Sequence, residues 1–166
     1  MSRMTVVAGQ ICCLFFLFST DPATAQSQLR SYRNEAMRVL AFRPPGGWEM
    51  APQSSYPRIL ASYSWKDGKL TLSGERVQKE LTATALVEQS RSALMKQGFT
   101  HLSVQPDGDR VALDADLDSG KRFVRQLYIV ENGVAYVLTL VAPVVDRGRS
   151  LADFQEAVRS LQLAPP

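Results

Sequence analysis

The sequence predicts an α+β domain with a central antiparallel sheet of about six strands and with helices packed on the faces of that sheet. Short segments that alternate apolar and polar residues are joined by tight turns, of which Asp67-Gly68 and Asn132-Gly133 give the plainest signals. Two longer segments, residues 82–97 and 150–161, instead repeat apolar residues at helical spacing. The order is strands, a helix, a four-strand meander and a helix, which favours an antiparallel sheet. The length of 166 residues suits one domain.

Residues 1–25 have the layout of a secretory signal peptide. Arg3 precedes an apolar run over residues 11–18, which is too short to span a bilayer. Ala23-Thr24-Ala25 then places small residues where signal peptidase needs them, just before Gln26. The sequence therefore predicts export, to the periplasm or as a secreted protein, with an uncleaved N-terminal anchor as the alternative.

The cysteines and the charge balance exclude several classes of function. Cys12 and Cys13 lie inside the apolar run, which disfavours lipidation, and both leave with the signal peptide. The exported chain then has no disulfide, and it keeps the formal net charge of +3 because Arg3 and Asp21 cancel. The positive charge is spread along the sequence without interleaved aromatics, so nucleic-acid binding is not expected. No membrane span is expected after cleavage, and the charge supports only weak attraction to anionic surfaces.

The exported chain is expected to begin with a polar lead-in and a short strand. Residues 26–36 are polar and lack periodicity, and the single domain is expected over residues 37–163. A strand over residues 37–42 stops at a Pro-Pro-Gly-Gly turn, and Trp48 follows that turn. We expect Trp48 to fill the core, and an exposed contact with a partner is the alternative.

A β-hairpin is predicted next, with Asp67-Gly68 as its two-residue turn. Residues 58–65 alternate, and their apolar side chains share one face. The turn sets apolar residues opposite one another in a defined register. That register pairs Trp65 with Leu70 and Tyr63 with Leu72.

A helix is predicted over residues 82–97. Thr82 or Thr84 supplies the N-cap, and Gly98 ends the helix. Its inward stripe consists of Leu86, Ser90, Ala93 and Leu94.

Four strands follow the helix. They are expected over residues 101–105, 110–118, 122–130 and 134–142, with a turn at Pro106-Asp107-Gly108 and another at Ser119-Gly120. The Asn132-Gly133 turn places Ile129 opposite Tyr136 and Leu127 opposite Leu138. Residues 134–142 are apolar on both faces, which predicts a central strand covered on both sides.

The last element is predicted to be an amphipathic helix. Ser150 and Asp153 have the spacing of a capping pair. The apolar stripe consists of Leu151, Phe154, Val158 and Leu161.

This layout resembles the superfamily that joins PsbP, the extrinsic protein of photosystem II, with bacterial DcrB-like periplasmic proteins. The resemblance rests on the order of a Pro-Gly-Trp turn over residues 43–48, a helix ending at Gln97-Gly98-Phe99, the hairpin around Asn132-Gly133 and the closing helix that ends at Leu161. It implies a PsbP-like α/β/α sandwich and a role in docking to other proteins rather than in catalysis. It carries over no functional residues, because no motif here matches the N-terminal and metal-site features of plant PsbP.

The single histidine, His101, is weighed as a catalytic residue and as a plain surface or strand-edge histidine. There is no G-x-S-x-G motif, and no second histidine or exported cysteine is available to act with it. One histidine and no exported cysteine also make a poor zinc site. We expect a surface histidine, no catalytic residue and no cofactor.

Asp114, Asp116 and Asp118 have the alternate spacing that opens a calcium-binding loop. The pattern then fails, because Ser119 stands where the loop needs glycine and Arg125 where it needs glutamate. In a strand this spacing places the three carboxylates on one face. We expect a solvated row paired with cations of the next strand, with no metal, and the row is a candidate contact surface. The expected cations are Lys121, Arg122 and Arg125.

The leading hypothesis is a non-enzymatic, exported accessory protein that binds a partner protein in the cell envelope. The candidate contact residues are Trp48, Asp114, Asp116 and Asp118. One alternative is a small-ligand carrier with an apolar pocket between helix and sheet. The other is a hydrolase that uses His101.

Overall fold

The computed structural model describes residues 31–52 and 58–165. The predicted signal peptide, residues 1–25, and both cysteines lie outside the described residues. The strands of the large sheet are β3 Glu49–Met50, β4 Ile59–Trp65, β5 Gly68–Arg76, β6 Thr100–Asp107, β7 Arg110–Leu117, β8 Arg122–Glu131 and β9 Val134–Pro143.

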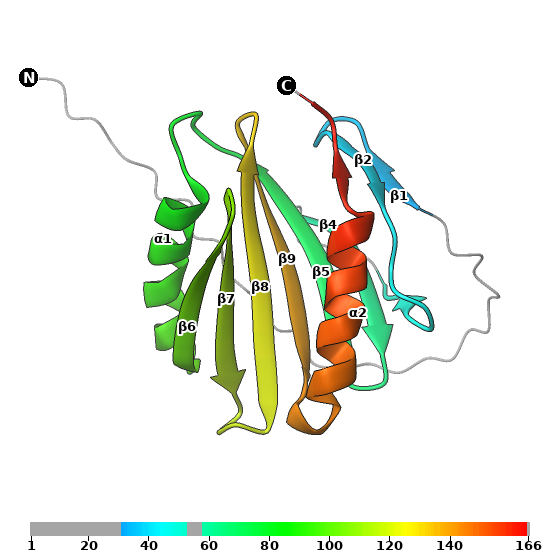
Figure 1. The fold of residues 1–166 in the computed structure, drawn as a ribbon, viewed down its shortest axis with the longest axis vertical. Helices are drawn as coiled ribbons and strands as arrows, with labels where there is room; N and C mark the ends of the chain where they lie inside the picture. The colour runs from blue at the N-terminus through cyan, green and yellow to red at the C-terminus, as the bar shows by residue number, and fades with distance from the viewer. Residues whose placement is uncertain (1–30, 53–57, 166) are drawn as a thin grey trace, which may run out of the picture.

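These strands form a seven-stranded sheet in the order β3-β4-β5-β9-β8-β7-β6, and every neighbouring pair is antiparallel (Figure 1). The α+β class is confirmed, whereas the expected number of about six strands is too small. The two-residue β3 is too short to leave an alternating pattern in the sequence. The strand predicted over residues 37–42 belongs to a different sheet.

The central strand β9 separates two cores, because successive side chains of a strand point to opposite faces. Tyr136, Leu138 and Leu140 belong to one buried cluster, while Val137 and Val141 belong to the other. Strand β9 is thus apolar on both faces and lies in the middle of the sheet, as the sequence predicts.

Helix α1, Ala83–Lys96, packs on β7 and β8 and buries Leu86, Val87 and Leu94. Thr82 is its N-cap, and the Thr82 hydroxyl accepts a hydrogen bond from the Ala85 amide. Gly98 follows the helix with φ +88, a conformation that favours glycine. The predicted helix is confirmed, and we name the side of the sheet that it covers the α1 face.

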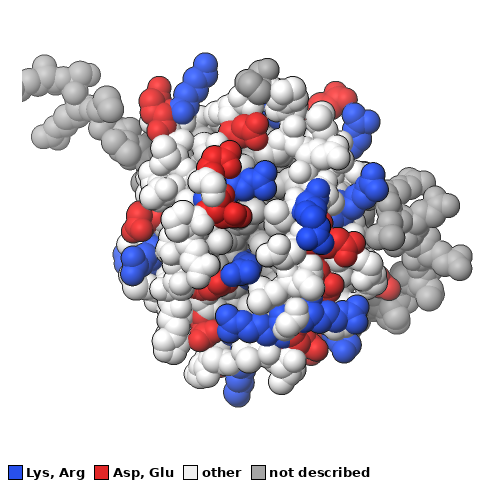
Figure 2. All heavy atoms as spheres, in the orientation of Figure 1, with Lys and Arg blue, Asp and Glu red and all other residues white. Residues whose placement is uncertain are grey.

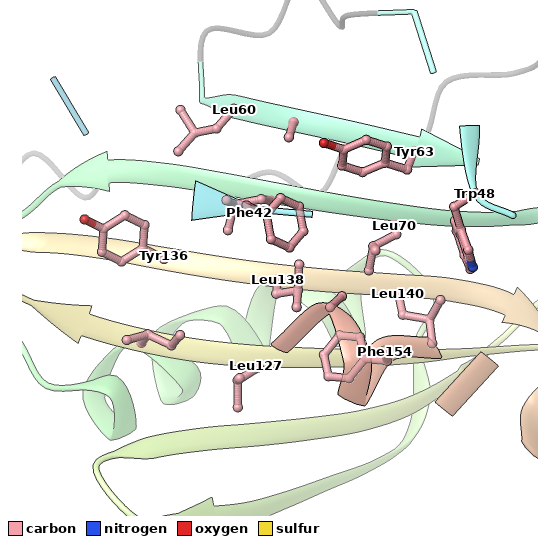
Figure 3. Close-up of a cluster of buried hydrophobic side chains, with 14 of the residues drawn as sticks. Phe42, Trp48, Leu60, Tyr63, Leu70, Leu127, Tyr136, Leu138, Leu140 and Phe154 are labelled. Atoms are coloured by element: carbon pink, nitrogen blue, oxygen red, sulfur yellow. The ribbon is translucent and has the colours of Figure 1, made fainter. Parts of the chain in front are cut away.

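Helix α2, Arg147–Ser160, packs against β9 on the opposite side of the sheet, which we name the α2 face. Phe154 and Ala157 are buried there, and Figure 3 shows Phe154 among Leu127, Leu138 and Leu140 of β8 and β9. The predicted capping pair is wrong. The helix begins at Arg147, after the 3₁₀ turn η1 Val144–Asp146, so Ser150 lies inside it and is buried.

A three-stranded antiparallel sheet joins α2 on the same side. It consists of β1 Tyr32–Asn34, β2 Val39–Phe42 and β10 Gln162–Leu163, in the order β1-β2-β10. Strand β1 lies within the polar lead-in, because its backbone pairs with β2 and Tyr32 packs against the core although its neighbours are polar. The last strand of the domain thus pairs with β2, near its beginning.

The two predicted hairpin turns have different outcomes. Around Asn132-Gly133, Ile129 pairs with Tyr136 and Leu127 with Leu138, as predicted. The other turn is formed by Lys66-Asp67, so Tyr63 pairs with Leu70 and Trp65 with Gly68. Gly68 belongs to the strand, where a Cβ would lie 3.2 Å from Cη2 of Trp48.

Candidate docking face

The two described helices cover opposite faces of the large sheet, and each lies over different strands. Helix α1 covers the α1 face at β7 and β8, whereas α2 and the three-stranded sheet lie over the other half of the α2 face. In Figure 1 no described helix or strand lies in front of β6 and β7. We call this area the open face. It consists of His101, Ser103, Asp114, Asp116 and Arg125.

Asp114 and Arg125 form a two-point ion pair at the centre of the open face. They stand directly opposite in the pairing of β7 with β8. Arg125 donates from Nε to Oδ1 at 2.8 Å and from Nη2 to Oδ2 at 2.7 Å. Both side chains are less than one-fifth exposed, so water screens this pair less than a surface pair. The predicted cross-strand pairing is confirmed for this aspartate.

Asp116 contacts His101 of the edge strand β6. The distance from His101 Nδ1 to Asp116 Oδ2 is 3.0 Å. The register of β6 shifts between Thr100 and Ser103, and His101 has φ +51, so its side chain leans out at this irregularity. The His101 side chain is 82% exposed. This contact makes Asp116 and His101 the protruding part of the open face.

Asp118 does not belong to the row that the sequence predicts. Strand β7 ends at Leu117, and Asp118 lies in the following turn with φ +53. Arg122, expected to neutralise the row, instead donates from Nη2 to the Asp67 carbonyl oxygen at 2.9 Å. Within residues 31–52 and 58–165, no group of three acidic, histidine or cysteine side chains is arranged to hold a metal ion.

Trp48 is buried, with 4% of its surface exposed. Its indole Nε1 donates to Asp153 Oδ2 of α2 at 2.9 Å, and its ring lies 6.4 Å from that of Trp65. The interpretation of Trp48 as a core residue therefore holds, and it does not present a contact surface.

A cavity of about 460 Å³ lies where β2 runs into the Pro44 turn beside the end of α2. It is lined by Arg43, Pro44, Gly46, Glu156, Arg159 and Ser160, three of which carry a charge. The Ser160 hydroxyl is engaged with the backbone of Arg43, so it is not available to a ligand. This cavity differs from the apolar pocket between helix and sheet that a carrier would need.

Sequence reasoning does not single out Ser103 for the open face. Ser103 pairs with Asp114 across β6 and β7, and it is exposed. The alternation Ser103-Val104-Gln105 was the available signal, since it places Val104 on the covered face and the two polar residues on the other.

Comparisons with known proteins identify the fold. No protein-family model matches the sequence, and no curated protein matches it either. The chain is similar to the solution structure of cyanobacterial PsbP (CyanoP) from Synechocystis sp. PCC 6803, with a TM-score of 0.58 and 11% identity over 86% of this chain and 98% of that chain. It also matches a crystal structure of the protein of unknown function PA94 from Pseudomonas aeruginosa, with a TM-score of 0.48 and 15% identity over 84% of this chain and 100% of that chain.

The architecture is that of an α+β protein with helices on both faces of an antiparallel sheet. The similarity to cyanobacterial PsbP makes the assignment specific, because the chain has a PsbP-like fold. The resemblance drawn from the sequence is thus confirmed for the fold. No helix of the described residues has the length and apolar character needed to cross a membrane.

Proposed function

We propose that this chain is an exported, non-enzymatic accessory protein that binds a partner protein of the cell envelope through the open face. The observation that carries the proposal is the open face itself. Half of one side of a seven-stranded sheet lies uncovered by any described element, and ordered charges stand on it. The PsbP-like fold supports an extracytoplasmic location.

The charges of the open face favour a protein as the ligand. Arg125 is held by Asp114, and so the face presents charges of both signs at fixed positions, which sets the register of a partner. Asp116 keeps acceptor capacity beyond its contact with His101, because a carboxylate has more lone pairs than one partner uses. The matching partner surface is polar and supplies a cation to Asp116.

A hydrolase is the second candidate, because His101 has a carboxylate partner as a general base would. Among the described residues, however, no hydroxyl bonds to the other ring nitrogen, and an imidazole that is 82% exposed lies in bulk water. We therefore favour binding. Asp116→Asn would abolish a hydrolytic activity and leave a docking role only weakened.

Photo-crosslinking tests the proposal. A photoreactive amino acid at Ser103 lies on the open face, and the same group at Arg91 on exposed α1 is the matched control. We expect one dominant adduct with an envelope protein from position 103, lost in Asp116→Lys and retained in Glu88→Lys. Equal adducts from both positions, or an adduct insensitive to Asp116→Lys, would refute docking through the open face.

Export is tested separately by mass spectrometry of the protein from the envelope fraction. We expect a chain that begins at Gln26, since Ala23 and Ala25 suit signal peptidase. A chain that retains Cys13 with an attached lipid would overturn this.

A further inference from the structure

One end of the molecule combines exposed apolar side chains with a cluster of cations. In Figure 1 the β4–β5 turn, the β7–β8 turn and the start of α2 lie at the same lower end. We call residues 66–67, 118–122 and 144–149 the basic end. Figure 2 shows Lys and Arg side chains forming a band across the lower part of this view.

The basic end contains the most exposed large apolar side chain of the described residues. Val145 is 91% exposed, and its neighbour Val144 is 38% exposed. Burial away from water stabilises the apolar side chain of a valine. Two adjacent valines at the tip of a turn give up that stabilisation unless another apolar phase covers them.

The basic end contains five cations and three carboxylates. The cations are Lys66, Lys121, Arg122, Arg147 and Arg149, and the carboxylates are Asp67, Asp118 and Asp146. The formal balance of these eight residues is +2, and Arg149 also lies 3.7 Å from the carboxylate of Asp153 in α2. Lys66 and Arg149 lie over the ring of the half-buried Trp65, at 4.5 and 4.1 Å from its centroid.

Hydrogen bonds hold the three segments together as one surface. The Val144 amide donates to the Lys121 carbonyl oxygen at 3.0 Å, which joins η1 to the β7–β8 turn. Arg122 donates to the Asp67 carbonyl oxygen at 2.9 Å, which joins that turn to the β4–β5 turn. The surface is ordered before any ligand arrives, so binding pays little conformational entropy.

We propose that the basic end binds the surface of a membrane that contains anionic phospholipid. Val144, Val145 and the edge of Trp65 enter the boundary between headgroups and acyl chains, and the cations contact lipid phosphates. The shape favours a membrane over a protein, because the exposed apolar side chains, Val144 and Val145, are aliphatic and stand on one turn, while cations cover the ring of Trp65. A protein hot spot would instead present aromatic anchors and pockets. The open face shares no residue with the basic end, so this proposal does not depend on the proposed function.

Vesicle co-sedimentation provides the test, with phosphatidylcholine alone and with equal amounts of phosphatidylcholine and phosphatidylglycerol. The unsubstituted protein and its variants are purified in the same form. Any contribution to vesicle binding from residues outside the basic end is therefore the same in each of them. We expect sedimentation with the anionic vesicles only, weakening as salt is raised. Val145→Glu and Lys121→Glu should each weaken binding about tenfold or more, because each change removes favourable contact and adds repulsion.

Met95→Glu and Arg91→Glu are the matched controls, since they make the same changes on exposed positions of α1. They should bind as the unsubstituted chain does. In a Trp48→Phe variant, bromine on the lipid acyl chains should quench Trp65 when anionic vesicles are added. Absence of sedimentation at low salt, or equal loss in all four variants, would overturn the proposal. Capture of an acidic protein that competes with the vesicles would assign the basic end to a protein partner instead.

Discussion

At the scale of single residues, two buried tyrosines differ in whether their hydroxyl groups form a hydrogen bond. Tyr136 and Tyr63 belong to the same core cluster. The Tyr136 hydroxyl donates to the Met37 carbonyl oxygen at 2.7 Å and thereby ties β9 to the chain before β2. The Tyr63 hydroxyl is buried, and no described residue bonds to it.

We expect the two phenylalanine variants to differ in stability. Tyr136→Phe should lower the free energy of unfolding by about 1 kcal/mol, the net value of one hydrogen bond. Tyr63→Phe should leave it unchanged or raise it, because the lost hydroxyl was desolvated without compensation. Urea unfolding followed by circular dichroism measures both, and an equal loss in both variants would contradict the assignment.

The same tyrosines predict a loss of stability in alkali. Burial raises the pKa of Tyr63 above 10.0, with a smaller contribution from Tyr32. Burial also raises the pKa of Tyr136, helped by Glu131 and partly opposed by Arg38. Between the unfolded and folded pKa values the folded state holds more protons, so the free energy of unfolding falls as pH rises.

We therefore expect stability to be intact below about pH 10 and to decline above it. The double variant Tyr63→Phe/Tyr136→Phe should decline less steeply. Urea midpoints measured across this pH range test the idea, and parallel curves for the two proteins would show that other groups cause the decline.

The aspartates that look alike in sequence should respond differently to neutralisation. Asp114→Asn removes a charge that Arg125 bonds at two points in a half-buried site, so it should destabilise by about 2 kcal/mol. Asp118→Asn is the matched control. Asp118 is exposed in a turn with φ +53, which asparagine also adopts readily, so stability should change by less than about 0.5 kcal/mol.

Melting temperatures of the two variants make this comparison. A similar loss for both would place Asp118 in an interaction like that of Asp114. Calcium titration tests whether the aspartates bind a metal ion. We expect no binding tighter than millimolar, because the calcium-loop pattern fails at Ser119 and Arg125.

At the scale of elements, α2 is expected to be indispensable to the fold. Phe154 is 3% exposed and packs on the α2 face of the sheet. Phe154→Ala should cost about 3 to 5 kcal/mol, since the cavity it leaves adds to the lost burial. Gln155→Ala, an exposed position on the same helix, is the control and should be nearly neutral. If both variants have the same melting temperature, α2 does not stabilise the sheet.

The two hairpins show which part of an element can be predicted from sequence. Asn132 and Gly133 adopt φ +54 and +73, and these residue types favour such values, so the turn is readable locally. In the other hairpin Lys66 takes φ +49, while the glycine serves contact with Trp48. A glycine required by tertiary packing looks the same in sequence as a turn glycine. The predicted register was therefore wrong by two residues.

The predicted start of α2 is also wrong, because a residue with the spacing of a helix cap makes a tertiary contact instead. Asp153 has the spacing of a capping residue, yet its carboxylate accepts from the Trp48 indole, 105 residues away. The short strands β3 and β10, two residues each, were missed because they are defined by pairing alone. Long periodic segments such as β9 and α1 were predicted well because their own residues determine them.

The candidate site was only partly visible in the sequence. The pairing of Asp114 with Arg125 follows from strand period and was expected. The contact of Asp116 with His101 depends on a register shift in β6, and the exclusion of Asp118 depends on where β7 ends. Neither can be read from composition. The basic end, assembled from three turns, was invisible until the turns were placed side by side.

At the scale of the whole molecule, the described helices and strands leave part of one face of the large sheet uncovered. Two helices and a small sheet share the task of covering two large sheet faces, and they lie over opposite halves. The part of the α2 face that no described element covers carries the Asp114–Arg125 ion pair and the Asp116–His101 contact instead of a core. The fold thus carries a polar surface, the open face, next to the basic end, and the two share no residue.

The pairing of β10 with β2 has a consequence for how the chain acquires this structure. Gln162 pairs with Ala41, so the three-stranded sheet cannot close until almost the whole domain has emerged from the ribosome. Strand β5 likewise waits for β9, its neighbour in the sheet. Such distant pairings make folding slow, on the order of milliseconds to seconds. A nascent chain that cannot fold early stays unfolded for longer. A protein must be in that state to cross a translocation channel before it folds.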